Sequence, residues 1–305
     1  MHTSIVALAG AGVLALVLTT SGCTSAAANT GVSAVQQSPT AQAAGLRSMA
    51  PQGSTTHPVS QSRFTLPPTS GFFDYQLGGG YPPAKGVTVV TRDSTDSPAQ
   101  GVYSICYVNG FQTQPGESWP DSLILHTADG KPLVDAGWPD EHIIDTSTAS
   151  KRAAVAARQQ TVVASCAKKG FKAIEFDNLD SWTRSKSMLT EADAIALAKL
   201  LVSAAHARGL AASQKNAADL AKVGKQTIGF DFATTEECDR FSECGEYTKV
   251  YGPHVLDIEY SDDLRGTFGA ICKRPSTPKQ TVLRDHNLLT PSQGGYVFAY
   301  CLLTF

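Results

Sequence analysis

The sequence IEFDNLD, residues 174–180, places three acids on and just after a short apolar segment. In a strand, successive side chains point to opposite faces, so Ile174 and Phe176 share one face while Glu175 and Asp177 share the other. Burying a polar group without a partner costs roughly 2 to 7 kcal/mol, and a charged group costs more. The acids are therefore either paired with other groups or part of a functional site.

Helices are predicted on both sides of this segment. Residues 147–167 are rich in Ala, Val, Arg and Gln, and KKG at 168–170 gives a basic last turn and a glycine stop. TEAD at 190–193 has the pattern of a capping box opening a second helix that runs to Gly209. The order of helix, strand, acidic loop and helix is typical of an α/β fold, in which catalytic groups lie at the carboxyl ends of strands.

Eight segments have the composition and spacing of strands in βα repeats. They are residues 72–77, 87–91, 102–108, 173–176, 210–214, 228–233, 255–258 and 281–283. Eight strands are what a closed parallel barrel needs, and polar residues gather where several of these segments end. We therefore predict an α/β protein, a single (β/α)8 TIM barrel with its site at the mouth.

Length and charge restrict the partners of the chain. Its 305 residues and 42% hydrophobic content allow a full core, and its net charge of −2 argues against a nucleic-acid partner. Residues 171–263 nevertheless hold 16 acids and 10 bases. This excess suits a cationic or amine-bearing substrate, although a solvated acidic surface would give the same count.

The first 22 residues have the features of an export signal, with an apolar run over residues 5–18. Ser-Gly-Cys at 21–23 resembles the end of a bacterial lipoprotein signal, in which Cys23 would become the lipidated first residue. Two features depart from that pattern, because Thr20 occupies a position that prefers an aliphatic residue and the leader lacks Lys and Arg. We expect an exported protein, either a bacterial cell-surface lipoprotein or secreted, that meets a membrane only through a lipid on Cys23.

The segment that follows the leader lacks the residues that build a core. Residues 23–65 are dominated by Ala, Ser, Thr, Gln, Pro and Gly, so they cannot recover the entropy lost on ordering and are predicted to be a disordered tether. Residues 66–305 then form the (β/α)8 domain. We expect this domain to be a monomer.

Six further cysteines remain once Cys23 is set aside. In an exported protein an even number indicates disulfides, although many connectivities are open and sequence alone does not choose among them. Chain order suggests three consecutive pairs: Cys106 with Cys166, Cys238 with Cys244, and Cys272 with Cys301. No CxxC motif is present and no two of the seven histidines have metal-helix spacing, so we expect no metal ion or cofactor.

Several polar and aromatic residues at strand ends have structural alternatives. Asp93 could have the purely structural role of capping a helix. Lys215 could form a structural ion pair with one of the acids. Trp182 could be a sugar-stacking platform or loop packing. Tyr107 and Tyr260 could hydrogen-bond a ligand or fill the upper layer of the barrel.

Six motifs, taken in order, resemble those of glycoside hydrolase family 114. They are YQL at 75–77, ICYVNG at 105–110, EFDNLD at 175–180, QKNA at 214–217, EEC at 236–238 with EC at 243–244, and IEY at 258–260. The family is a set of TIM barrels that includes endo-α-1,4-polygalactosaminidases, and the resemblance covers about residues 70 to 301. The departures are Thr235, where the family often has Asn, and Leu179, where Val is common.

The resemblance implies that Asp177 is the nucleophile and Glu236 the general acid/base. Glycosidic cleavage independently needs one ionised and one protonated carboxyl group. Asp177 would stay charged beside Lys215 or Asn216, while Glu236 would need a pKa raised by burial or by neighbouring acids. We expect an endo-acting, retaining hydrolase of an α-1,4-linked galactosamine-containing polysaccharide, with its carboxyl groups roughly 5 to 5.5 Å apart.

Other polar residues at the strand ends are expected to bind the polysaccharide. These are Gln76, Asp93, Tyr107, Asn109, Glu175, Asn178, Asp180, Lys215, Asn216, Glu259 and Tyr260. Two alternative functions stay open: a non-catalytic carbohydrate-binding surface lipoprotein, and a polysaccharide deacetylase. The deacetylase reading is disfavoured, because that chemistry normally needs a metal held by paired histidines.

Overall fold

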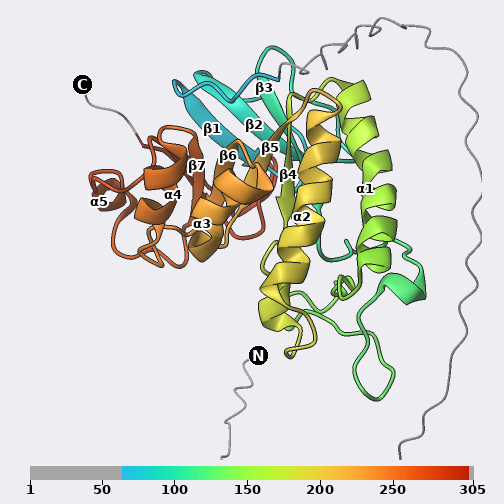
Figure 1. Cartoon of the computed structure of the whole chain (residues 1–305). Helices are drawn as coiled ribbons and strands as arrows, with labels where there is room; N and C mark the ends of the chain where they lie inside the picture. The colour runs from blue at the N-terminus through green and yellow to red at the C-terminus, as the bar shows by residue number, and fades with distance from the viewer. Residues whose placement is uncertain (1–63, 302–305) are drawn as a thin grey trace, which may run out of the picture. The chain divides into compact units, whose positions relative to one another are not determined.

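The computed structural model describes residues 64–301 (Figure 1). Eight parallel strands pair with their neighbours in chain order. They are β1 Phe72–Gln76, β2 Val87–Asp93, β3 Tyr103–Asn109, β4 Ala173–Asp177, β5 Ala211–Lys215, β6 Phe232–Glu236, β7 Val255–Tyr260 and β8 Gln280–Arg284. A short ninth strand, β9 Phe298–Tyr300, runs antiparallel to β8 and was not expected from the sequence. The expected signal, the lipidation site Cys23 and most of the tether lie outside the described residues.

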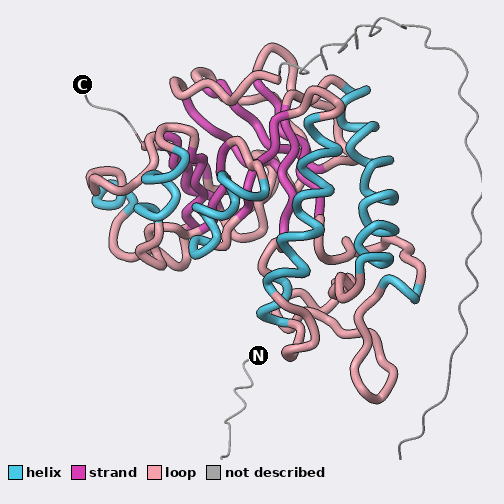
Figure 2. Tube along the Cα trace, viewed as in Figure 1, coloured by secondary structure: helices cyan, strands magenta, loops and turns pink. Residues whose placement is uncertain are grey.

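The helices lie outside the sheet and follow β3 to β7 (Figure 2). They are α1 Ala149–Lys169, α2 Glu191–His206, α3 Ala221–Val223, α4 Cys244–Tyr251 and α5 Phe268–Ile271. Figure 1 shows α1 and α2 side by side. In the described chain, loops rather than helices connect β1 to β2 and β2 to β3. The fold is thus a nearly closed α/β barrel whose helical layer is incomplete.

The helix boundaries follow the expected local signals. Thr148 caps α1 by accepting from the Lys151 backbone N–H, and α1 ends at Gly170, whose φ of 100° suits glycine. A reciprocal capping box joins Thr190 and Asp193 at the start of α2, as the TEAD motif predicts. None of the helices among residues 64–301 is long and apolar enough to cross a bilayer.

The predicted position of the sixth strand was wrong. Residues 228–233 were expected, but β6 covers Phe232–Glu236, and the apolar Ile228 ends a turn of π-helix instead. The polar end of β6 is stable in the sheet because its hydroxyls have buried partners. Thr234 hydrogen-bonds Ser213 at 2.9 Å, and Thr235 donates to Asp257 at 2.8 Å.

The two faces of β4 bury different kinds of side chain. Ile174 and Phe176 belong to the hydrophobic cluster between the sheet and the helices. Ala173 packs inside the barrel with Ala211, and Glu175 faces the same interior. The alternation expected from IEFDNLD is confirmed.

Three disulfides tie the barrel to its connections, and they are the pairs that chain order suggested. Cys106–Cys166 joins β3 to α1, and Cys238–Cys244 closes the loop before α4. Cys272–Cys301 joins the end of α5 to the chain after β9.

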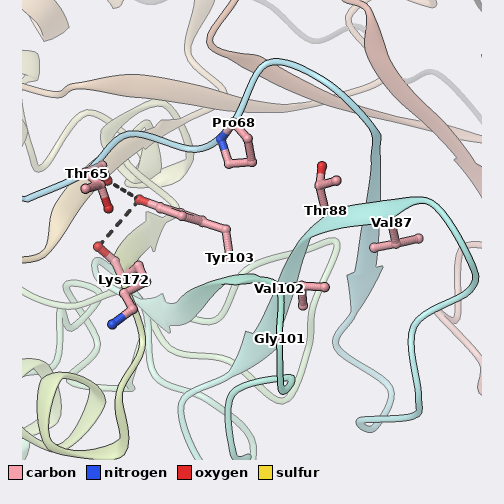
Figure 3. Close-up of a pocket in the computed structure, with 8 residues that line it drawn as sticks. All are labelled: Thr65, Pro68, Val87, Thr88, Gly101, Val102, Tyr103 and Lys172. Carbon is pink, nitrogen blue, oxygen red and sulfur yellow. Dashed lines mark hydrogen bonds between the residues drawn. The ribbon is translucent and has the colours of Figure 1, made fainter.

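A hollow of about 580 Å³ lies at the amino ends of β2 and β3, opposite to the expected mouth (Figure 3). There the Tyr103 hydroxyl donates to the carbonyl oxygen of Thr65 at 2.6 Å and lies 3.5 Å from that of Lys172. This contact fixes the segment before β1 against the bottom of the barrel. Lys172 is the one ionisable lining residue other than Tyr103, so the hollow lacks paired groups for acid–base chemistry.

The seam between β8 and β1 is closed by side chains, because no strand pairing joins them among residues 64–301. Arg284 is fully buried, its Nη1 lies 3.2 Å from Asp74 Oδ1, and it also donates to the carbonyl oxygen of Tyr75. Asp74 accepts further bonds from Gln76 at 2.7 Å and Tyr81 at 3.0 Å. Arg284 therefore compensates a buried carboxylate and substitutes for the missing backbone ladder.

We expect Arg284→Met to lower the free energy of unfolding by about 3 to 5 kcal/mol, since it leaves Asp74 buried without its cation. The matched control is Arg240→Met, which breaks the exposed Arg240–Asp263 pair and should change the free energy of unfolding far less, because exposed ion pairs contribute little. Urea unfolding at pH 7 measures both variants. Equal losses would mean that Arg284 does not close the seam.

Candidate active site

Inward-facing residues from six strands meet at the carboxyl end of the barrel, where catalytic groups of such barrels lie. They are Tyr75 on β1, Tyr107 on β3, Asp177 on β4, Lys215 on β5, Glu236 on β6 and Tyr260 on β7. The register of the parallel strands pairs Asn109 with Asp177 and Lys215 with Thr234 at this end of the barrel. The sheet thus brings together residues that are up to 185 positions apart in the sequence.

Lys215 is the centre of this group and is only 1% exposed. Its Nζ lies 2.9 Å from Glu236 Oε2, 3.3 Å from Asp177 Oδ2 and 3.7 Å from Glu175 Oε1. Burial acts to lower the pKa of Lys215, but the surrounding carboxylates outweigh it and raise that pKa well above its usual range. Lys215 is therefore a permanent ammonium shared by acids from two strands.

Asp177 has donors on both oxygens. Oδ2 accepts from the Tyr107 hydroxyl at 2.7 Å and from Lys215, while Oδ1 accepts from the backbone N–H of Asn178 at 2.7 Å. Burial acts to raise the pKa of Asp177, but Lys215 and these hydrogen bonds hold it below its ordinary value. Lys215 lies beside Asp177, as the sequence led us to expect, and this contact favours the charged form of the carboxyl group.

Glu236 is clamped by three side chains. Oε1 accepts from the Tyr260 hydroxyl, and Oε2 accepts from Lys215 and, at 3.3 Å, from Asn216 Nδ2. The Asn216 oxygen in turn accepts from the backbone N–H of Glu236 at 2.8 Å. Asn216 adopts a left-handed conformation, with φ of 49°, so its side chain spans from β5 to β6.

Glu175 lies one layer deeper and is fully buried. Its Oε1 accepts from the Tyr75 hydroxyl at 2.8 Å, and its Oε2 has no hydrogen-bond partner among the described residues. Burial, opposed mainly by Lys215, raises the pKa of Glu175 to about 7. The unpaired oxygen suits a protonated, neutral carboxyl group. Asp177 and Glu236 would then be the groups that interact with the charge of Lys215.

A cavity of about 1000 Å³ opens above these residues. Eight of the residues expected to act at the mouth line it: Asp93, Tyr107, Asp177, Asn178, Asp180, Asn216, Glu236 and Tyr260. Five others do not: Gln76, Asn109, Glu175, Lys215 and Glu259. Lys215 and Glu175 do not line the cavity but contact residues that do: Lys215 contacts Asp177 and Glu236, and Glu175 contacts Tyr75.

The remaining three residues outside the cavity have structural partners. Gln76 accepts from Arg92 Nε at 2.9 Å, on the outer side of β1. Asn109 is 2% exposed, and its oxygen accepts from Asn178 Nδ2 at 2.9 Å. It therefore holds the residue that follows Asp177.

Glu259 faces away from the barrel interior, because Ile258 and Tyr260 on the same strand face inward. Its Oε1 accepts from the backbone N–H of Asp239 at 2.7 Å. Glu259 also belongs to a buried group with Cys238, Cys244 and Asp257 whose ligand-type atoms lie within 4.8 Å of one another. The two cysteines form a disulfide, so they offer no thiolates to a metal ion.

The long loop after β3 adds site residues that the sequence did not reveal. Asp135, Trp138 and Glu141 from this loop line the cavity, as does Arg184 from the loop after β4. Arg184 Nε lies 2.6 Å from Asp135 Oδ2, and its Nη1 lies 3.0 Å from Asp180. The one available signal was the length of the loop, since no predicted strand or helix covers residues 109–146.

A barrel mouth that presents an acid at the end of β4 and another at the end of β6, over an open cavity, fits the class of glycoside hydrolases. The chain belongs to glycoside-hydrolase family GH114, whose sequence model matches residues 53–304. The expectation drawn from the six motifs is confirmed.

Comparison with the solved structure of Ega3 gives the same fold. Ega3 from Aspergillus fumigatus, solved in complex with galactosamine, has a TM-score of 0.62 and 22% identity, with 82% of this chain and 100% of that chain covered. The glycoside hydrolase domain of PelA from Pseudomonas aeruginosa has a TM-score of 0.46 and 16% identity, with 72% of this chain and 95% of that chain covered. A comparison with curated proteins found no match.

We expect Glu175→Gln to stabilise the protein at alkaline pH relative to the wild type. The pKa of Glu175 in the folded protein, about 7, lies above its ordinary value of 4.5, so its stability contribution is complete below pH 4.5 and is lost as pH rises through 7. Urea unfolding at pH 4 and pH 8 should show the difference between variant and wild type growing by about 3 kcal/mol in favour of the variant, at about 1.4 kcal/mol per pKa unit. Exposed Glu246→Gln, the control, should stay within about 0.5 kcal/mol of wild type at both pH values.

Proposed function

We propose that the protein hydrolyses an α-1,4-linked galactosamine-containing polysaccharide, acting on internal bonds and retaining the anomeric configuration. Asp177 is the nucleophile and Glu236 the general acid/base. The observation that carries this proposal is the position of Lys215 Nζ, in contact with one oxygen of each carboxylate at 3.3 and 2.9 Å. A shared contact with one ammonium group brings an oxygen of each carboxyl group close together, which favours the shorter spacing of retaining enzymes.

In the proposed reaction, an oxygen of Asp177 attacks the anomeric carbon while Glu236 gives its proton to the departing glycosidic oxygen. A glycosyl ester on Asp177 forms, and the chain beyond the cleaved bond leaves as an alcohol. Glu236, now a carboxylate, takes a proton from water, and the resulting hydroxide breaks the ester and restores Asp177. Tyr260 and Asn216 orient Glu236, and Tyr107 orients Asp177, through the hydrogen bonds described above.

The charge of the cavity supports an amine-bearing polymer. Ten acids line it: Asp93, Asp135, Glu141, Asp177, Asp180, Glu191, Asp219, Glu236, Glu237 and Glu243. Against them the lining has one arginine, Arg184, and one histidine, His286. Deacetylated galactosamine is cationic, and the galactosamine bound to the structurally similar Ega3 belongs to this chemical class.

Incubation with a galactosamine polymer, followed by sizing of the products, tests this proposal against the alternatives. Shorter oligomers support a hydrolase, released acetate would indicate a deacetylase, and binding without either would indicate a carbohydrate-binding protein. Internal cleavage should shorten the average chain early, whereas terminal cleavage would release small sugars first.

We propose that the protein is exported, either anchored by a lipid on Cys23 or secreted, and that its folded part is monomeric. Mass spectrometry of the mature N-terminus identifies the acylated residue, if one exists. Size-exclusion chromatography with light scattering measures the molar mass in solution.

We expect Asp177→Asn to lower kcat by at least about 10³-fold, because an amide cannot form the glycosyl ester. Glu236→Gln should lower it by about 10² to 10⁴-fold, since the leaving oxygen loses its proton donor. Product formation from the polymer is the measurement, with circular dichroism to verify folding. A folded Asp177→Asn variant with wild-type activity would remove the nucleophile assignment.

Retention predicts the stereochemistry of the first product. Proton NMR recorded during early hydrolysis should show the α-anomer at the new reducing end before mutarotation mixes the two anomers. An initial β-anomer would contradict the covalent intermediate, whatever the rate of hydrolysis.

A further inference from the structure

Trp138 is a large apolar side chain left in water at the mouth of the cavity, where it is 62% exposed. The other two tryptophans have partners: Trp119 donates to Glu117 at 2.9 Å, and Trp182 packs against two hydrophobic clusters. Among residues 64–301, the indole of Trp138 makes no hydrogen bond or ring contact. Burying apolar surface gains roughly 25 cal/mol per Å², so an exposed tryptophan beside a cavity indicates a ligand contact.

The turn that carries Trp138 is held in place before any ligand binds. Asp135, 4% exposed, accepts from the backbone N–H of Gly137 at 2.8 Å through its side chain and from that of Trp138 at 3.2 Å through its carbonyl oxygen. Gln112 Nε2 and Arg184 Nε fix the Asp135 carboxylate at 2.7 and 2.6 Å. Binding at Trp138 therefore requires little ordering of the loop, which favours affinity.

Glu141 ends the same turn, where its backbone N–H donates to the carbonyl oxygen of Trp138 at 2.9 Å. Its carboxylate lines the cavity and accepts from Asn109 Nδ2 at 2.9 Å, but within the described chain it forms no ion pair. Burial raises the pKa of Glu141 to about 7, which a cationic partner would reverse. An aromatic face and an unpaired carboxylate on one rigid turn match a sugar ring that carries an ammonium group.

We propose that Trp138 and Glu141 form an outer subsite that binds one hexosamine unit of the polymer, with the ring against the indole and the ammonium toward the carboxylate. The inference rests on the proposed function, because the polymer is what extends from the catalytic pair into this part of the cavity. Asn109 donates to Glu141 and accepts from Asn178, the residue after Asp177, and both Glu141 and Asp177 line the cavity, so the subsite is linked to the proposed cleavage point. Such a subsite helps the enzyme to hold an internal stretch of polymer.

Binding can be measured without turnover in an Asp177→Asn background. Titration with deacetylated galactosamine oligomers should change the tryptophan fluorescence, and adding Trp138→Phe should remove most of that change.

In the active protein, Trp138→Ala should raise KM for the polymer about tenfold, while kcat changes less than about threefold. Glu141→Gln should raise KM more for the deacetylated polymer than for its N-acetylated form. The control is Leu200→Ala, which truncates an exposed apolar side chain on α2 outside the cavity.

The outcomes separate this subsite from the proposed hydrolysis. Cleavage by the wild type with Trp138→Ala kinetics equal to those of Leu200→Ala would overturn the subsite and leave the hydrolase proposal intact. A fluorescence change that depends on Trp138, without any cleavage by the wild type, would support the subsite in a binding protein. If the oligomers cause no fluorescence change that depends on Trp138, the subsite is overturned, whether or not the wild type cleaves the polymer.

Discussion

The shared ammonium of Lys215 is the interaction on which the rest of the site depends. An ammonium group that is 1% exposed needs acidic partners, and here its Nζ lies 3.7 Å from Glu175 and 3.3 Å from Asp177 on β4, and 2.9 Å from Glu236 on β6. Lys215 itself belongs to β5, which lies between β4 and β6. The distance between Asp177 and Glu236 is therefore set by the ammonium group that lies between them. It does not depend on the conformation of a loop.

This arrangement requires a fixed strand register. A slip of one residue in β5 would turn Lys215 toward the helices and bring Gln214 into the barrel. The observed register, which pairs Glu175 with Ser213 and Lys215 with Thr234, is supported by the Ser213–Thr234 hydrogen bond beneath the site. The polar interior of the barrel thus specifies the alignment that the catalytic geometry needs.

Much of the fold could be predicted, because β4 and its flanking helices have strong local signals in their alternation and caps. The sequence failed where tertiary partners outweigh hydrophobicity, as in β6, whose polar end is stabilised by Asp257 and Ser213 across the sheet. At the site, Asp177 and Glu236 could be inferred from motifs. The subsurface position of Lys215 depends on the three-dimensional register, which no local pattern encodes. The outward direction of Glu259, in contrast, follows from strand alternation once Tyr260 is assigned to the interior.

The position of Lys215 also fits both states of the proposed reaction. When Asp177 forms the ester it loses its negative charge, and Glu236 gains one as it gives up its proton, so the pair carries a single negative charge before and after the step. A cation that contacts both groups can balance that charge without moving. Because burial excludes water from Lys215, its attraction to the charge is strong and already oriented, as electrostatic preorganisation requires. Glu175 would add a second negative charge if it were ionised, and its burial opposes that by raising its pKa. The deeper acid thus keeps Lys215 available to the two that react.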